Sequence, residues 1–188
     1  MDLSPSAAPG RLETVRAFVN TWDIEARTEV LTSPAALAGW LIEADLLAAA
    51  DRAAGELDFE RAIALREAIR SILESNHRRA ELAPSAVEVV NTAAARARLR
   101  PSLTVESRWS VEAEADGVDG ALGRLLVIMT TAMNDATWVR LKVCGNDACR
   151  WAFYDTSRSR TGRWCSMEMC GNRAKQQAWR GRQDEARS

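Results

Sequence analysis

The chain has 188 residues, of which 47% are hydrophobic, and a formal net charge of −1. This length allows one ordinary domain or one domain with a small appendage, and the apolar content is ample for a hydrophobic core. The strongly apolar stretch from Leu125 to Met133 is too short to cross a bilayer, and residues 1–10 contain no apolar run typical of a signal peptide. We therefore expect a cytoplasmic protein with no membrane partner.

The first hundred residues predict a succession of helices. Apolar residues recur at helical spacing from Leu12 to Trp22. Ser33-Pro34 provides an N-cap and a proline at the first helical position, which predicts a second helix continuing to Leu47. Asp58 is the expected cap of a third helix, and Pro84 the start of a fourth.

The hydrophobic period changes after Pro101. Apolar and polar residues alternate between Ser102 and Glu114, which predicts a short two-stranded hairpin. Gly117 to Gly120 is the expected turn before a further helix from Ala121 to Ala136. Together these segments predict a helical N-terminal domain with a small β-hairpin, residues 1–138.

Residues 139–188 predict a second, smaller domain. Val139 to Val143 and Trp151 to Tyr154 have the alternation of short strands, and Asp155 to Gly162 forms a polar, arginine-rich loop. Ser166 is the expected N-cap of a final helix. The predicted fold is therefore mainly α, with the helical body followed by a finger made of a short β-hairpin and a helix.

The cysteines of the chain lie within 27 positions, as two close pairs separated by a loop: Cys144, Cys149, Cys165 and Cys170. This spacing is typical of a single tetrahedral zinc site, with one pair on a knuckle and the other at a helix start, as in a treble-clef-like finger. Two disulfides are the alternative, but they suit small secreted domains. Four thiolate ligands leave no open coordination position, so we expect one structural Zn²⁺ ion and no chemistry at the metal.

The residues around the cysteines resemble the CGNR zinc finger, named after the tetrapeptide that here is Cys170 to Arg173. The matching segments are Leu141 to Asp155, Ser157-Arg158, Arg163 to Met167 and Cys170 to Lys175. Upstream, Phe18 to Thr21, Leu37 to Leu41 and Leu65 to Ile69 resemble the ABATE domain, which precedes this finger in proteins described as putative stress-induced transcription regulators. One departure is that a single arginine, Arg163, precedes the Trp164-Cys165 step, where relatives often have two.

Basic residues are concentrated in the finger. Residues 140–188 hold 11 Lys and Arg against 5 Asp and Glu, a balance of +6, which leaves −7 for the rest of the chain. Arginine side chains suit phosphates and guanine edges, so we expect a nucleic-acid surface. The expected contacts are Arg150, Arg158, Arg160, Arg163, Arg173, Lys175 and Arg180. The resemblance favours DNA over RNA. Trp151, Trp164 and Trp179 fit a small core around the metal better than base stacking.

Two other functions stay open. The finger is alternatively a protein-interaction or dimerisation module whose basic face meets the acidic body, within the chain or across a homodimer. The helical body is alternatively a sensor for a small-molecule effector. Polar residues beside apolar helical stretches are its expected ligand contacts, although ordinary capping and interhelix hydrogen bonding explain them as well: Asn20, Thr21, Arg27, Arg66 and Asn91.

We expect no enzymatic activity. The only histidine, His77, falls near the end of the third predicted helix, where an exposed position is the ordinary explanation. No Ser/His/Asp or Cys/His arrangement can be assembled around it, and the sequence has no glycine-rich phosphate loop.

Overall fold

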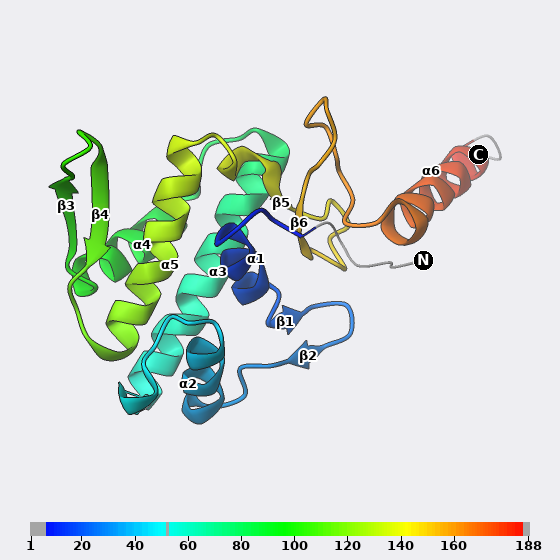
Figure 1. Cartoon of the computed structure of the whole chain (residues 1–188). Coiled ribbons are helices and arrows are strands. Elements are labelled where there is room, and N and C mark those ends of the chain that lie inside the picture. The colour runs from blue at the N-terminus through cyan, green and yellow to red at the C-terminus, as the bar shows by residue number, and fades with distance from the viewer. Residues whose placement is uncertain (1–6, 52, 186–188) are drawn as a thin grey trace.

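Helices dominate the molecule, as the sequence predicts. The computed structural model describes residues 7–51 and 53–185, so the outermost residues of both predicted domains lie outside it. The helices, shown in Figure 1, are α1 (Leu12–Val19), α2 (Pro34–Glu43), α3 (Glu56–Arg78), α4 (Pro84–Arg96), α5 (Gly117–Asn134) and α6 (Asn172–Glu185).

The start of α2 follows the predicted capping chemistry, whereas its end does not. Ser33 Oγ accepts a hydrogen bond from the amide of Ala36 at 3.2 Å, with Pro34 at the first helical position. The helix ends at Glu43, short of the predicted Leu47, because Asp45 adopts a left-handed φ of 55°. Leu47 still reaches the core because its amide turns back to the carbonyl of Leu41 at 3.1 Å.

Two other helix starts correct the sequence prediction. Gly55 is the N-cap of α3, and Asp58 lies inside the first turn, where its carboxylate accepts from the Gly55 amide at 3.0 Å. The segment Gly117–Gly120 is the first turn of α5 and not a preceding loop. A Cβ at Gly120 would lie 2.0 Å from the carbonyl oxygen of Ala115, so only glycine allows the helix to start against this backbone.

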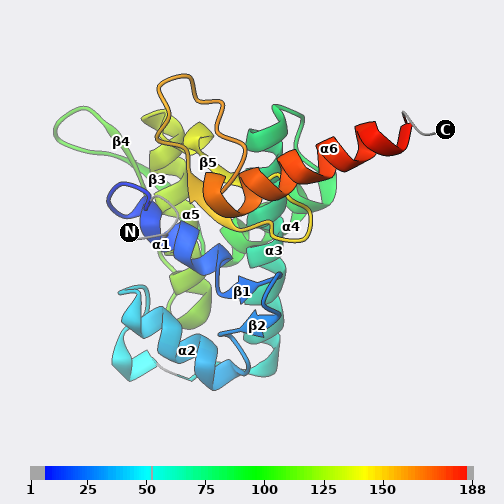
Figure 2. The same ribbon diagram turned by 90° about the vertical axis from the view of Figure 1, so that its right-hand side faces the viewer.

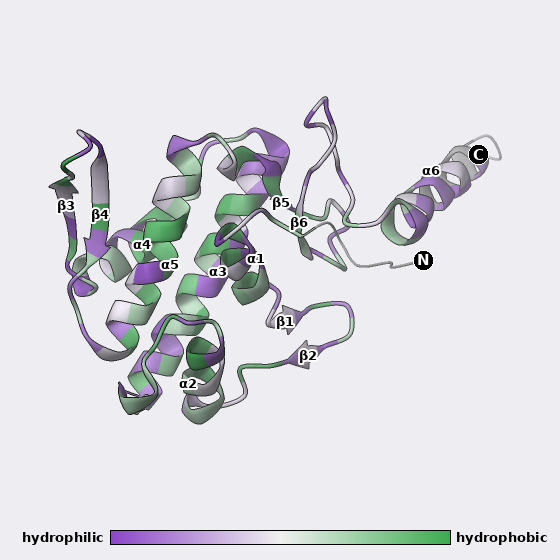
Figure 3. Cartoon of the chain, viewed as in Figure 1, coloured by the Kyte–Doolittle hydropathy of each residue, from purple (hydrophilic) through white to green (hydrophobic). Residues whose placement is uncertain are grey.

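The hydrophobic core lies around α3, which is 23 residues long and packs against α1, α2, α4 and α5. Its apolar side chains meet those of α1 and α5, and the helices in Figure 3 show alternating green and purple bands where apolar and polar positions follow one another. Fully buried side chains come from several helices: Phe18, Leu37, Leu41, Leu65, Ile69, Leu73 and Leu125.

In the described part of the chain, three antiparallel hairpins accompany the helices: β1 (Trp22–Asp23) with β2 (Thr28–Glu29), β3 (Leu99–Leu103) with β4 (Trp109–Ala113), and β5 (Leu141–Val143) with β6 (Ala152–Tyr154). The β3–β4 hairpin confirms the alternation after Pro101, although β3 begins earlier and includes that proline. The β1–β2 hairpin was not predicted, and it takes Trp22 out of the first helix. The predicted strand from Val139 to Val143 begins later than expected. Trp138–Arg140 form a helical turn, and the strand itself starts at Leu141.

The finger strands belong to the same core as the helices. Leu141 and Val143 of β5 and Ala152 of β6 are buried with side chains of the helical body. β5 packs against α3, and β6 against α1. In contrast, α6 extends away from the body in Figure 2. Among the described residues, no helix has the length and apolar character needed to span a membrane. The domain boundary at residue 138 stays a prediction.

Candidate functional site

The four cysteines converge as their spacing predicts. Cys144 follows β5, Cys149 lies in the knuckle before β6, Cys165 follows the arginine-rich loop, and Cys170 lies in the helical turn Met167–Gly171. Their Sγ atoms all lie within 4.8 Å of one another, with 3.7 Å from Cys149 to Cys165 and 3.8 Å from Cys165 to Cys170. A tetrahedral zinc ion with Zn–S bonds of about 2.3 Å requires S–S separations of roughly 3.8 Å. The sulfur positions therefore fit one zinc ion.

Backbone hydrogen bonds hold the ligand loops in place. The Cys144 amide donates to the carbonyl of Trp151 at 2.9 Å, and the Cys149 amide donates to that of Asn146 at 2.8 Å, which closes the knuckle. Ser166 caps the helical turn that carries Cys170, because its Oγ accepts from the Met169 amide at 3.3 Å. The predicted cap is confirmed.

The charge of the sulfur cluster also favours a cation. Hydrogen bonds from Cys149 and Cys165 lower the pKa of the Cys144 thiol to about 2, so one thiolate forms readily. The contact with Cys144 in turn raises the pKa of Cys149 to about 12 and also raises the pKa of Cys165. Deprotonation of Cys149 and Cys165 is therefore favoured by a positive ion among the sulfurs, which a bound Zn²⁺ supplies. All four positions are then thiolates, and the metal has a structural role.

A buried ion pair anchors the arginine-rich loop, a feature that sequence reasoning missed. Lys142 Nζ lies 2.7 Å from Asp155 Oδ2, with both side chains nearly fully buried. Asp155 also accepts from the amides of Ser157 at 3.0 Å and Gly162 at 2.8 Å. Lys142 donates in addition to the Arg160 carbonyl at 2.8 Å. Asp155 and Lys142 therefore hold the two ends of the loop, near Asp155 and Gly162, together on its buried side.

This anchor changes the expected role of Lys142. Its charge counts toward the basic balance of the finger, but it is neutralised by Asp155 and faces inward. Burial alone would raise the pKa of Asp155, yet hydrogen bonds from Lys142 and from two backbone amides outweigh it and lower the pKa to about 2. The Asp155 carboxylate is therefore charged at neutral pH.

Polar side chains of the body fasten the finger to it. Arg70 on α3 is almost fully buried and donates to the carbonyls of Val19 at 2.7 Å and Arg150 at 3.0 Å. Asn76 donates from Nδ2 to the carbonyls of Trp138 at 3.0 Å and Leu141 at 3.1 Å. These residues could not be recognised beforehand, because their partners are backbone atoms distant in the sequence.

The residues predicted for a ligand pocket are mostly engaged by the protein itself. Asn20 bonds to the backbone of Ala152, and Thr21 Oγ1 accepts from Arg66 at 3.1 Å. Arg66 also pairs with Glu29 at 2.8 Å. Arg27 and Asn91 are exposed, on the β1–β2 turn and on α4. Hydrogen bonding within the protein therefore accounts for Asn20, Thr21 and Arg66, although the partner of Asn20 is a strand of the finger and not a helix, as the alternative explanation expects.

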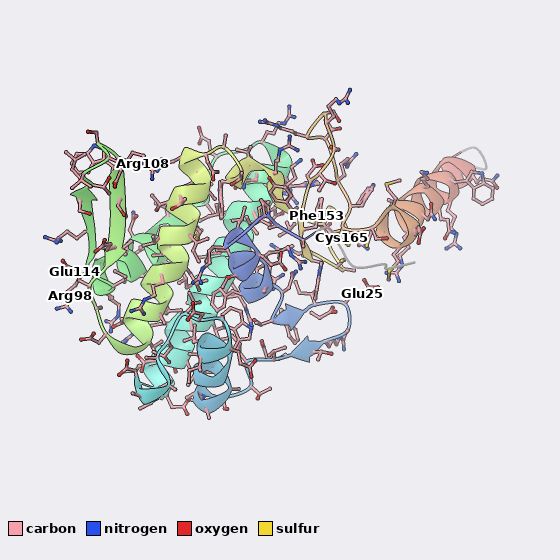
Figure 4. All side chains as sticks on the ribbon, viewed as in Figure 1. Glu25, Arg98, Arg108, Glu114, Phe153 and Cys165 are labelled. Carbon is pink, nitrogen blue, oxygen red and sulfur yellow. The ribbon has the colours of Figure 1, made fainter. Side chains whose placement is uncertain are left out.

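The predicted nucleic-acid contacts fall into two groups. Arg150 pairs with Glu74 at 2.9 Å, and Arg173 pairs with Glu25. Figure 4 shows Glu25 on the side of the molecule that carries Cys165. Among the carboxylates that the structure describes, none forms an ion pair with Arg158, Arg160 or Arg163, which lie exposed on the loop. Lys175 and Arg180 are exposed on α6.

Two of the three tryptophans near the metal are structural, as expected. Trp151 and Trp164 are half-buried and pack against the cysteines. The guanidinium carbon of Arg163 lies 5.3 Å from the ring centroid of Trp164, within the range of a cation–π contact. Trp179 on α6 is 55% exposed and does not belong to this small core.

His77 does not have the exposed position expected from the sequence. It is half-buried against the knuckle, and a Cβ added to Gly145 would lie 3.0 Å from its Nε2 atom. Burial lowers the pKa of His77, and the charges of Lys142 and Arg163 lower it further. Its Nδ1 atom is buried without a hydrogen-bond partner among the described residues. The residue is therefore a neutral packing element at neutral pH.

Two family models match the chain. Residues 13–139 match ABATE, described as "Putative stress-induced transcription regulator". Residues 140–183 match the CGNR zinc finger. No curated protein matches the chain. Both matched stretches contain the residues that carry the sequence resemblance.

Proposed function

Because the chain belongs to the ABATE family of putative stress-induced transcription regulators and carries a CGNR zinc finger, we propose that it binds DNA to regulate transcription. The finger has a treble-clef-like arrangement in this proposal, with a knuckle, the β5–β6 hairpin and a helix around one zinc ion. The protein acts in the cytoplasm and is not an enzyme. The zinc ion stabilises the fold of the finger and does not take part in a reaction, since four thiolates complete its coordination shell.

One observation carries this proposal: the exposed arginines stand on a loop that is fixed in place. Arg158, Arg160 and Arg163 face solvent, while the Lys142–Asp155 pair holds the loop beneath them. A charged side chain on an ordered loop loses less conformational entropy on meeting a phosphate than one on a mobile loop. Lys175 and Arg180 extend the basic surface along α6, which stands away from the body (Figure 2).

The experiment is a selection from random DNA and RNA pools with the zinc-loaded full-length protein. The proposal expects enrichment of duplex DNA, loss of binding after chelation of zinc, and affinity that falls steeply between two salt concentrations. Enrichment of RNA alone would favour the RNA-binding alternative. Binding to neither pool at low salt would rule out a nucleic-acid function for the finger.

The second candidate function is protein interaction, with a homodimer as its simplest form. The β3–β4 hairpin projects from the body in Figure 1 and exposes apolar side chains, with Val105 96% and Trp109 71% exposed. Such residues are typical of contact surfaces when they cluster. Sedimentation of the wild type and Trp109→Ser distinguishes the cases, because a dimer formed through the hairpin would dissociate in the variant.

The effector-sensing role of the body has weaker support, since Asn20, Thr21 and Arg66 are satisfied by protein partners. A groove of about 240 Å³ between α3, α4 and α5 is the better place to look for an effector. Arg61, Glu88 and Arg96 line it together with apolar side chains. A thermal-shift screen of metabolites, repeated with Thr92→Trp to fill the groove, tests this role.

A further inference from the structure

A basic cleft lies where the end of α3 meets the arginine-rich loop. It encloses about 370 Å³ and is lined from the body by His77, Arg78 and Arg79, and from the finger by Lys142, Arg160 and Arg163. Figure 1 shows both segments at the upper edge of the molecule, the loop in orange and the end of α3 in green. The residues that line this cleft include no carboxylate.

Acidic residues outside the cleft neutralise only some of the basic side chains that line it. Lys142 pairs with Asp155, and Arg78 pairs with Glu74 at 2.7 Å. Within the described part of the chain, Arg79, Arg160 and Arg163 have no acidic partner. Three like charges around one cavity repel each other, and an anion placed between them removes that repulsion.

The walls of the cleft are fixed before any ligand arrives. Asn76, in the last turn of α3, donates to the carbonyl of Leu141 in the finger at 3.1 Å and to that of Trp138, at the end of the body, at 3.0 Å. On the opposite wall, Lys142 holds the carbonyl of Arg160 at 2.8 Å. A second cavity of about 350 Å³ continues the first and shares Arg79, Lys142 and Arg160 with it. The arginines therefore approach one space from two rigid elements.

Phosphate is the anion that this chemistry suits best. Guanidinium groups donate paired hydrogen bonds to phosphate oxygens, and several arginines around one cavity suit an ion with more than one charged oxygen. We propose that the cleft is a phosphate site, and that the body thereby contributes Arg79 to the nucleic-acid interface. This second part rests on the proposed function. The nucleic-acid surface then spans both matched stretches of the chain and is not confined to the finger.

The test measures DNA affinity against salt for the full-length, zinc-loaded protein and three variants. Arg79→Gln and Arg160→Gln each remove one charge from the cleft. Arg98→Gln is the matched control, because Arg98 is exposed and shares their left-handed φ, at 49° against 55° for both cleft residues. Figure 4 shows Arg98 at the left edge of the molecule, well away from Cys165. We expect each cleft variant, but not the control, to lower the salt slope by about one unit.

Pyrophosphate provides the second arm, since it offers phosphate oxygens without a nucleic-acid backbone. It should raise the melting temperature of the wild type and of Arg98→Gln, and the rise should be lost in the Arg79→Gln/Arg160→Gln double variant. If the protein binds DNA while Arg79→Gln behaves as the control does in the salt arm and the double variant behaves as the control does with pyrophosphate, the cleft proposal is overturned and the proposed function stands. If pyrophosphate binds through the cleft but no DNA binds, the phosphate site stands and DNA binding falls. Absence of both signals overturns both.

Discussion

Both polar atoms of the Asn20 side-chain amide form hydrogen bonds with the backbone of one residue of the finger, Ala152. Its Oδ1 accepts from the Ala152 amide at 2.8 Å, and its Nδ2 donates to the Ala152 carbonyl at 2.9 Å. The side chain thus pairs with β6 as a neighbouring strand would, directly after α1 ends. The position of the finger on the body depends on this pair together with Arg70 and Asn76.

Replacing Asn20 by alanine should therefore destabilise the whole protein. The change leaves the amide of the buried residue Ala152 without its partner and its carbonyl with only a long hydrogen bond from Arg16, at 3.5 Å. The expected cost is about 2 kcal/mol in the free energy of unfolding. Chemical denaturation of the zinc-loaded protein measures this cost. Asn91→Ala, on an exposed site of α4, is the matched control and should change stability by less than about 0.5 kcal/mol. Equal effects of the two substitutions would contradict the assigned role of Asn20.

The Asp155 carboxylate should stabilise the fold in a pH-dependent way. Its pKa is lowered in the folded protein to about 2 from an ordinary value of 3.8, so its contribution is complete above about pH 4 and is lost as the pH falls toward 2. The shift corresponds to about 2 kcal/mol. Asp155→Asn should thus be less stable than the wild type at pH 7, and the difference should shrink below pH 4. Because loss of zinc would itself unfold the finger, the zinc content of both proteins is measured at each pH and only zinc-loaded samples are compared. A difference independent of pH among these samples would refute the ionic role.

Gly162 should tolerate no side chain. An added Cβ would lie 2.7 Å from Asp155 Oδ1, so Gly162→Ala must displace the carboxylate from its bonds with Lys142 and the loop amides. We expect a loss of about 1–3 kcal/mol in unfolding free energy and weaker DNA binding. Gly39→Ala is the control, since a Cβ there meets nothing within 4 Å and lies inside α2. That change should stabilise the helix by up to about 1 kcal/mol.

Removal of zinc should unfold the finger and leave the helical body folded. Residues 144–183 depend on the metal for most of their order, because few of their side chains besides those near β6 reach the main core. Hydrogen exchange after chelation should therefore show fast exchange there and continued protection in α1, α3 and α5. We also expect partial loss of protection toward the end of α3, where Arg70 and Glu74 lose their partner Arg150. Collapse of protection throughout the body would show that the finger is part of its folding unit.

The arginines of the finger should differ in their importance for DNA. Arg158 is exposed and without an acidic partner among the described residues, whereas Arg173 is paired with Glu25. Arg158→Gln should therefore lower the salt slope by about one unit, while Arg173→Gln should have a smaller effect, since contact with phosphate requires its ion pair to open first. Fluorescence anisotropy with one labelled duplex at several salt concentrations measures both variants. A larger effect at Arg173 would reverse this order.

Local patterns in the sequence predicted the mainly helical fold and the metal site. Ser33-Pro34 and Ser166 mark helix starts by chemistry that acts within three residues, and the cysteine spacing alone indicates a tetrahedral zinc site. The alternation after Pro101 predicts the β3–β4 hairpin for the same reason, since strand periodicity is a local signal. Predictions were less accurate where a helix ends or begins against another part of the chain, as at Asp45 and Gly120.

The tertiary structure alone decided which basic residues are available to a partner. A sequence counts Lys142, Arg150 and Arg173 as positive charge, but the folded chain pairs them with Asp155, Glu74 and Glu25. It likewise brings Arg79 of the body beside Arg160 of the finger, a relation between residues that are 81 positions apart. Capping and metal spacing are local and can be read from the chain, whereas charge pairing acts through space and depends on packing between distant segments.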